Sequence, residues 1–210
     1  MEITSAGYME YISLVAQKIE AGKDYITGLD AATGDGDHWA NLNMGFQKLL
    51  ESRKELEALP LGEMFKKIGM LVMSTVGGSS GVLYGSAYLA ASKAIGQSRT
   101  IDAPLLCAVL EAELAAIMSR GNAKPGFKTM IDSLAPAVEA FKSALASGAD
   151  DAAALRAMKK GAIGGMESTR AMEAVKGRAT YQTGKGVGHL DPGAVTMCYQ
   201  LEILADYLAA

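Results

Sequence analysis

Apolar residues recur at intervals of three and four along most of the chain, and this period constrains the fold more than any other feature. Three such rows are Tyr8, Ile12, Val15 and Ile19, then Leu134, Val138, Phe141 and Leu145, then Met197, Leu201, Leu204 and Leu208. The spacing places the apolar side chains of each row on one face of an α-helix. No run of β-branched residues alternates with polar ones, so strands are not expected. The sequence therefore predicts an all-α fold.

Glycine and proline divide the chain into about eight amphipathic helices. The expected spans are 4–21, 38–58, 61–75, 80–95, 102–119, 128–147, 150–174 and 192–208. Acidic residues at 150 and 151 suit the positive end of the seventh helix, and Asp191-Pro192 is typical of an N-cap followed by proline. With 210 residues, half of them hydrophobic, the chain is expected to form a single domain over residues 1–210.

Composition excludes several classes of function. The net charge of −3, with no basic block, argues against nucleic-acid binding. The N-terminal residues have no apolar core of a secretory signal. Residues 68–92 carry no charge, but glycine, serine and threonine interrupt them, so two buried helices joined by a glycine loop are favoured over a membrane span. Cys107 and Cys198 have no close partner and are interpreted as reduced core residues. A cytoplasmic protein without membrane contact is expected.

The glycines gather at four places, residues 34–36, 77–81, 121–126 and 184–193. All four lie at predicted helix ends. In an up-and-down helical array, alternate loops come to the same end, and these four loops follow the first, third, fifth and seventh predicted helices. A functional site is therefore expected at one end of the bundle.

The first of these loops carries three aspartates within eight residues, Asp30, Asp35 and Asp37, followed by His38 and Asn41. Mg²⁺ is usually bound by a few carboxylates together with phosphate oxygens and water. The simpler alternative is a solvated turn in which one aspartate caps the next helix. Three carboxylates in one loop favour a metal site.

The other three loops offer groups that bind phosphate. Backbone N–H groups of Gly77–Gly81 can form an anion nest at a helix N-terminus, and Arg178 can pair with a phosphate through two hydrogen bonds. Residues 120–130 supply cations, a hydroxyl and the apolar Met130. Each loop taken alone has a plain alternative, namely a flexible connection, a Pro-Gly turn rimmed by solvated lysines, or a mobile surface loop. Together the four loops favour a magnesium–nucleotide site.

At this point the sequence resembles a known family. The segments Gly28–Asp30, Gly34–His38, Gly77–Gly81, Ser119–Gly121 with Lys128–Met130, and Gly177–Ala179 with Gly188-His189 and Asp191–Ala194 occur in the order found in DhaL, the nucleotide-binding L subunit of dihydroxyacetone kinases. The matching segments cover nearly the whole chain. Such a chain is similar to a subunit that lacks a substrate domain of its own.

The resemblance implies an antiparallel barrel of eight amphipathic helices with the nucleotide site at one end. It also implies two Mg²⁺ ions held by Asp30, Asp35 and Asp37 that bridge to the phosphates of ADP or ATP. Arg178 would be the catalytic residue. The residues implied to bind the nucleotide are His38, Asn41, Gly78, Ser79, Ser80, Gly121, Thr129, Met130, Arg178, Asp191, Pro192 and Gly193.

The resemblance further implies a separate K subunit that holds the ketose covalently on a histidine. Two donor schemes exist in the family. In one, ATP exchanges with ADP. In the other, which suits a free-standing chain of this size, ADP stays bound and is rephosphorylated by the M subunit of the phosphotransferase system. A homodimer is also open.

Some residues depart from the family pattern. Trp39 stands where the family usually has glycine, Leu42 and Met44 replace methionine and arginine, and Phe127 replaces aspartate. Trp39 is expected to crowd the loop that carries Asp30, Asp35 and Asp37, called the metal loop below, or to stack on a ligand. The changes leave two alternatives to a dihydroxyacetone kinase subunit. One is an ATP-exchanging subunit for another keto-sugar such as a tetrulose, and the other is a non-catalytic nucleotide-binding regulatory module.

Overall fold

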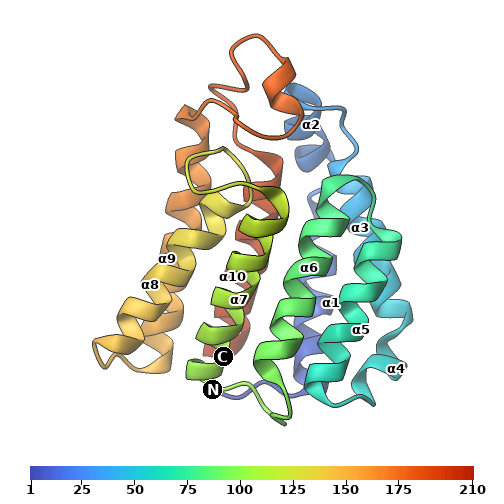
Figure 1. Cartoon of the computed structure of the whole chain (residues 1–210), viewed down its shortest axis with the longest axis vertical. Helices are drawn as coiled ribbons and strands as arrows, with labels where there is room; N and C mark the ends of the chain where they lie inside the picture. The colour runs from blue at the N-terminus through green and yellow to red at the C-terminus, as the bar shows by residue number, and fades with distance from the viewer. The chain divides into compact units, whose positions relative to one another are not determined.

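The computed structural model describes residues 1–210, and α-helices make up most of it (Figure 1). It contains ten α-helices, and its single β-bridge joins Ile3 and Ile101. The prediction of an all-α fold is confirmed. The helices are α1 Ser5–Ala21, α2 Lys23–Thr33, α3 His38–Glu51, α4 Arg53–Glu57, α5 Leu61–Thr75, α6 Gly78–Ile95, α7 Ala103–Gly121, α8 Ile131–Ala146, α9 Asp151–Ser168 and α10 Pro192–Ala209, with short 3₁₀ helices η1 Thr169–Ala171 and η2 Arg178–Tyr181.

Helix α2 was not predicted, because sequence analysis placed a loop there. Gly28 lies in the middle of this helix, and glycine lowers helix propensity by about 1 kcal/mol relative to alanine. The helix forms because Ile26, Asp30 and Thr33 recur at intervals of four and three and are buried, and because α2 packs against α10. Tertiary packing here outweighs local propensity.

Three other predicted boundaries are also wrong. The helix expected at 38–58 breaks at Ser52 into α3 and α4. Helix α8 begins at Ile131 rather than 128, because Lys128 has a left-handed backbone with φ of 59°. Helix α9 ends at Ser168 instead of 174, and the chain continues through η1 into an extended residue, Met172.

The chain divides into two compact units, and unit 1 consists of Met1–Gln17 and Asn41–Asn122. Within it, α5 packs on α6 and α6 on α7 (Figure 1). Helices α5 and α6 approach closely at Gly69, which has no side chain. A Cβ added there would lie 3.0 Å from the carbonyl oxygen of Gly85. The uncharged run 68–92 forms the second half of α5 and most of α6, two helices joined by a short connection that contains Gly77, as predicted. None of the helices combines the length and apolar character that crossing a bilayer requires.

Unit 2 consists of Lys18–Ala40 and Ala123–Ala210. Helices α8 and α9 lie side by side and α10 packs on both (Figure 1). Gly161 and Gly165 let α9 approach the backbone of α8, since a Cβ on Gly161 would lie 2.5 Å from the carbonyl oxygen of Pro136. Cys198 on α10 and Cys107 in unit 1 are both buried and form no disulfide, as expected.

Candidate metal and nucleotide site

A carboxylate cluster forms where α2 ends in unit 2. Asp30 lies in the last turn of α2, and Asp35 and Asp37 follow in the connection to α3. One carboxylate oxygen from each of the three lies within 4.8 Å of the others. Asp30 is 8% exposed, whereas Asp35 and Asp37 face solvent. The structure thus brings together the three predicted metal ligands, with one buried anchor and two accessible carboxylates.

The backbone around Asp30 accounts for this arrangement. The amide of Gly34 donates to the carbonyl oxygen of Asp30, and a Cβ at Gly34 would lie 2.5 Å from Asp30 Oδ1, so a side chain here would displace the Asp30 carboxylate. Gly36 has φ of 78°, which also favours glycine. The amide of His38 donates to Asp30 Oδ2 over 2.9 Å. The buried carboxylate therefore faces the N-terminus of α3, where the helix dipole stabilises negative charge.

This donor set fits a hard divalent cation. Carboxylate oxygens are the ligands that Mg²⁺ prefers in proteins. Three carboxylates this close repel one another, and a cation among them removes that repulsion. The guanidinium of Arg178 already contacts the cluster, with Nη2 2.7 Å from Asp35 Oδ2. The structure therefore brings Arg178, from η2, next to the predicted metal ligands.

His38 is oriented by α10. Its Nε2 lies 2.9 Å from Thr196 Oγ1, and that hydroxyl itself donates to the carbonyls of Pro192 and Gly193. The hydroxyl therefore accepts from Nε2–H, an assignment that rests on the hydrogen-bond network. Burial lowers the pKa of His38 from its usual value, while Asp30 and Asp37 oppose the shift. A neutral His38 fixes the metal loop against the start of α10.

Trp39 lies at the junction of α1 and α2. Its Nε1 donates to the carbonyl oxygen of Ile19 over 3.0 Å, and Lys23 Nζ lies 4.7 Å from the centre of its ring. The indole thus covers the last turn of α1 and satisfies one of its terminal carbonyls. This packing gives Trp39 a structural role at the end of α1.

The third and fourth predicted loops meet beside this cluster, also in unit 2. A Cβ at Gly193 would lie 3.6 Å from the amide nitrogen of Met130, so the start of α10 touches the start of α8. Asp191 caps α10 by accepting from the amide of Ala194 over 2.7 Å, and Pro192 occupies the first helical position, as predicted. Burial raises the pKa of Asp191 to about 7.

The remaining candidate residues belong to unit 1. A Cβ at Gly77 would lie 2.5 Å from Asn41 Oδ1, so Asn41 contacts the glycine loop before α6. Gly78 has φ of 65°, and Ser79 and Ser80 follow it in the first turn of α6. This is the geometry of a helix N-terminus with free amides and hydroxyls. Gly121 is the last residue of α7.

Sequence analysis missed three residues that shape the site, namely Thr196, Asp132 and the buried Lys128. Asp132 accepts from the amides of Gly126 and Thr129 over 2.5 and 2.8 Å, and so closes the loop before α8. Lys128 was expected among the cations of this loop or, alternatively, among solvated lysines, and it is 2% exposed. The available signal for Thr196 was that it is the one polar residue between Pro192 and Cys198.

The family model of the DAK2 domain matches residues 32–206, which is most of the chain. The chain belongs to the DhaL family. It is 32% identical over 205 residues to the ADP-binding subunit DhaL of the PEP-dependent dihydroxyacetone kinase of Escherichia coli K12, covering 98% of both chains. It is 38% identical over 204 residues to the DhaL subunit of the PTS-dependent dihydroxyacetone kinase of Lactococcus lactis, covering 96% of both. The similarity to these DhaL subunits thus extends over nearly their whole length.

A solved structure has a similar fold. The crystal structure of the dihydroxyacetone kinase from C. freundii in complex with AMP-PNP and Mg²⁺ is 26% identical to this DhaL-family chain, with a TM-score of 0.74 over 98% of it. The chain spans only 34% of that enzyme. It therefore corresponds to about a third of that larger kinase.

Proposed function

We propose that this chain is the nucleotide-binding, phosphoryl-donating subunit of a dihydroxyacetone kinase, a phosphotransferase with an alcohol group as acceptor. The observation that carries the proposal is the group of three carboxylates within 4.8 Å on the loop between α2 and α3. The DhaL relatives are named as ADP-binding subunits, and the C. freundii structure is named as a complex with AMP-PNP and Mg²⁺. Both names agree with a magnesium–nucleotide site.

In this proposal Asp30, Asp35 and Asp37 hold two Mg²⁺ ions, which supply positive charge beside the phosphates of ADP or ATP. Phosphoryl transfer depends mainly on positioning and on neutralising phosphate charge. Arg178 already lies against Asp35, and its exposed guanidinium can reach the transferring group. It is the residue of this chain that we assign to the catalytic step.

Each unit carries residues that we propose for nucleotide binding. From unit 1, the amides and hydroxyls before and within the first turn of α6 supply phosphate donors. From unit 2, the start of α8 and the N-terminal turn of α10 line the site. The proposed residues are His38, Asn41, Gly78, Ser79, Ser80, Gly121, Thr129, Met130, Asp191, Pro192 and Gly193. The DAK2 family model matches residues in both units, which supports our proposal that residues 1–210 form a single nucleotide-binding domain.

The acceptor is proposed to be dihydroxyacetone or a related small ketose held by a separate K subunit. The phosphoryl donor is proposed to be a phosphotransferase-system M subunit acting on ADP that stays bound. The PEP-dependent and PTS-dependent names of the relatives support this scheme over ATP exchange.

The nucleotide content of freshly purified protein tests the proposal. The protein is denatured, the released nucleotide is separated by chromatography, and Mg²⁺ is quantified alongside. ADP near one per chain is expected. An empty site that takes up ATP instead would indicate an exchanging kinase subunit. A site that binds neither nucleotide would overturn the kinase assignment.

A further inference from the structure

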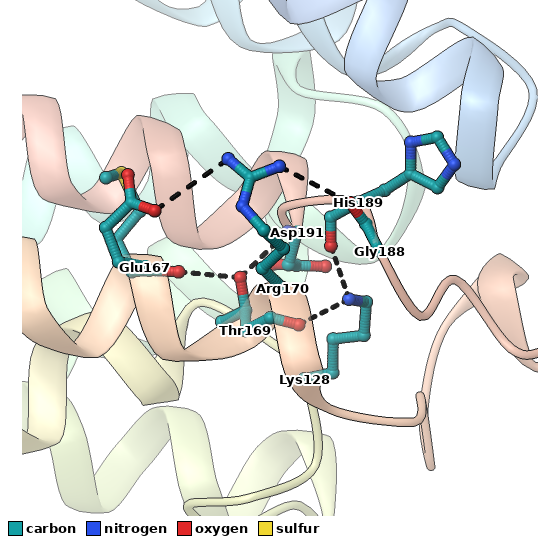
Figure 2. A network of polar contacts seen from close by, with 8 residues as sticks. Lys128, Glu167, Thr169, Arg170, Gly188, His189 and Asp191 are labelled. Carbon is teal, nitrogen blue, oxygen red and sulfur yellow. Dashed lines mark hydrogen bonds and ion pairs between the residues drawn. The ribbon is translucent and has the colours of Figure 1, made fainter.

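Lys128 is a buried cation in the loop before α8. Its side chain is 2% exposed, and Figure 2 shows its ammonium pointing between two backbone carbonyls. Nζ lies 2.5 Å from the carbonyl oxygen of Thr169 and 2.6 Å from that of His189. Buried lysines are rare unless they are paired, so these two hydrogen bonds explain its position.

The two carbonyls lie near opposite ends of the long segment 172–191, because Thr169 precedes the segment and His189 is close to its last residue. Thr169 lies directly after α9, where helix carbonyls lack partners and the dipole favours a cation. His189 comes two residues before Asp191, the N-cap of α10. Lys128 therefore joins the end of α9 to the start of α10, and closes the base of the loop that carries Arg178.

Burial lowers the pKa of Lys128 from its usual value, and Arg170 adds to this shift, whereas Asp191 and Asp132 oppose it. Because the ammonium donates to two carbonyls at once, the charged form is the one that these contacts stabilise.

The backbone of Lys128 is held in an uncommon conformation. Its φ of 59° lies in the left-handed region, which costs about 1 kcal/mol or more for a residue other than glycine. The surrounding loop maintains this conformation. Asp132 accepts from the amides on both sides of Lys128, and the carbonyl of Phe127 accepts from the amide of Val175 over 3.2 Å.

The 172–191 segment itself buries little apolar surface. Val175, Tyr181 and Val187 are all exposed, and Tyr181 is 88% exposed. A segment of this kind is held by hydrogen bonds rather than by packing. Another contact at its base is the hydrogen bond from the Gly188 amide to the Arg170 carbonyl oxygen, over 2.8 Å. The Asp191 amide also donates to Thr169 Oγ1, over 3.1 Å (Figure 2).

We propose that Lys128 is a positioning residue of the nucleotide site: its ammonium clamps the base of the 172–191 segment and so sets the places of Arg178 and Asp191. This inference rests on the proposed function, because it assigns the clamp to nucleotide binding. Gly186 lies between the clamp and the end of α2. A Cβ built on Gly186 would lie 3.1 Å from Lys128 Cε and 3.4 Å from a methyl group of Thr33, the last residue of α2.

Hydrogen exchange tests the clamp directly. Lys128→Met keeps most of the stem and removes the charge, and Lys159→Met is the matched control because Lys159 forms an exposed ion pair with Asp206 in the same unit. Exchange is followed by mass spectrometry without Mg²⁺ or nucleotide. In Lys128→Met, the amides of residues 172–191 are expected to exchange about tenfold faster, from the loss of a charge-assisted hydrogen bond. The control is expected to match the wild type.

Nucleotide affinity then tests the positioning role. Isothermal titration of ADP in the presence of Mg²⁺ is expected to show about tenfold weaker binding for Lys128→Met and wild-type binding for the control. Should Lys128→Met fail to fold, Lys128→Arg replaces it. It keeps the charge but cannot place one nitrogen between both carbonyls. Faster exchange in 172–191 is expected for it too.

Two results separate the inference from the proposed function. A folded Lys128 variant with wild-type exchange in 172–191 would overturn the clamp, whatever its nucleotide affinity. Faster exchange with unchanged ADP affinity would overturn the positioning role alone. Absence of ADP binding by the wild-type protein would overturn the proposed function, while the exchange comparison would still decide whether the clamp exists.

Discussion

Replacing Asp37 with asparagine separates metal binding by the carboxylate cluster from its effect on the fold. Two unit charges 4.8 Å apart repel by roughly 1 kcal/mol in water and by about 3 kcal/mol at an effective dielectric constant of 20. Asp37 is exposed, so the smaller value applies. Asp37→Asn removes its repulsion with both Asp30 and Asp35, and the metal-free variant is expected to be as stable as the wild type or up to about 2 kcal/mol more stable.

With Mg²⁺ the order reverses. A cation at 100 times its dissociation constant stabilises the folded state by about 2.7 kcal/mol, which raises the melting temperature of a chain of this length by roughly 5–10 °C. Loss of a residue that hydrogen-bonds to a metal ligand typically lowers metal affinity by about 10–100-fold. Loss of the ligand itself is therefore expected to lower Mg²⁺ affinity by at least about 100-fold. The variant then retains about 0.4 kcal/mol, or roughly 1 °C, of the magnesium-dependent increase.

The assay is thermal unfolding with and without Mg²⁺, followed by circular dichroism. Fluorescence of Trp39, the single tryptophan, gives a second readout next to the metal loop. Asp24→Asn is the matched control, since Asp24 is an exposed aspartate in the first turn of α2. A full magnesium-dependent increase in Asp37→Asn would refute the metal assignment. A metal-free melting temperature several degrees below that of the control would refute the electrostatic reasoning.

Three further predictions concern single side chains. Arg178→Met should lower the melting temperature by less than about 4 °C, because the ion pair of Arg178 with Asp35 is exposed. It should reduce phosphoryl transfer in a reconstituted assay at least about tenfold, and undiminished transfer would contradict the catalytic role. Trp39→Phe should lose about 1 kcal/mol with its hydrogen bond to Ile19 and keep its Mg²⁺ affinity, whereas a tenfold weaker Mg²⁺ titration would place the indole in the metal site. Burial raises the pKa of Glu113 to about 7, so the folded chain retains a proton that the unfolded chain releases near pH 4.3, and stability falls as the pH rises through this window. Glu113→Gln should therefore have a free energy of unfolding up to about 3 kcal/mol above that of the wild type at pH 8, and equal to it near pH 4. Urea unfolding without Mg²⁺ measures this difference, and a difference that does not change with pH would contradict the reasoning.

Local signals in the sequence predicted the starts of α9 and α10. Asp191 accepts a hydrogen bond from the amide three residues later, as the predicted N-cap, and Asp150, expected among the acidic residues that open α9, does the same. A capping interaction involves neighbouring residues and depends little on the rest of the chain. The same holds for the glycines of the metal loop, where Gly34 and Gly36 permit a turn that brings three aspartates together.

Local signals failed where packing decided the conformation. Helix α2 forms despite Gly28 because its buried residues pack in unit 2. Lys128 leaves the helical conformation despite a sequence that favours a longer α8, because its backbone and ammonium are held by Asp132, Thr169 and His189. Neither outcome follows from propensity, since both depend on residues distant in sequence.

The sequence by itself determined the helical class, the caps and the group of three carboxylates. The period of the apolar residues and the placing of three aspartates within eight residues are both properties of short stretches of chain. Only the tertiary structure decided which side chains join that cluster. His38 meets Thr196 across 158 residues, and Arg178 meets Asp35 although the two belong to separate sequence segments of unit 2. Contacts of this kind depend on how whole helices pack, and many chain paths share the same local pattern. The burial of Lys128 has the same origin, since its partners are two backbone carbonyls that carry no signal in the sequence.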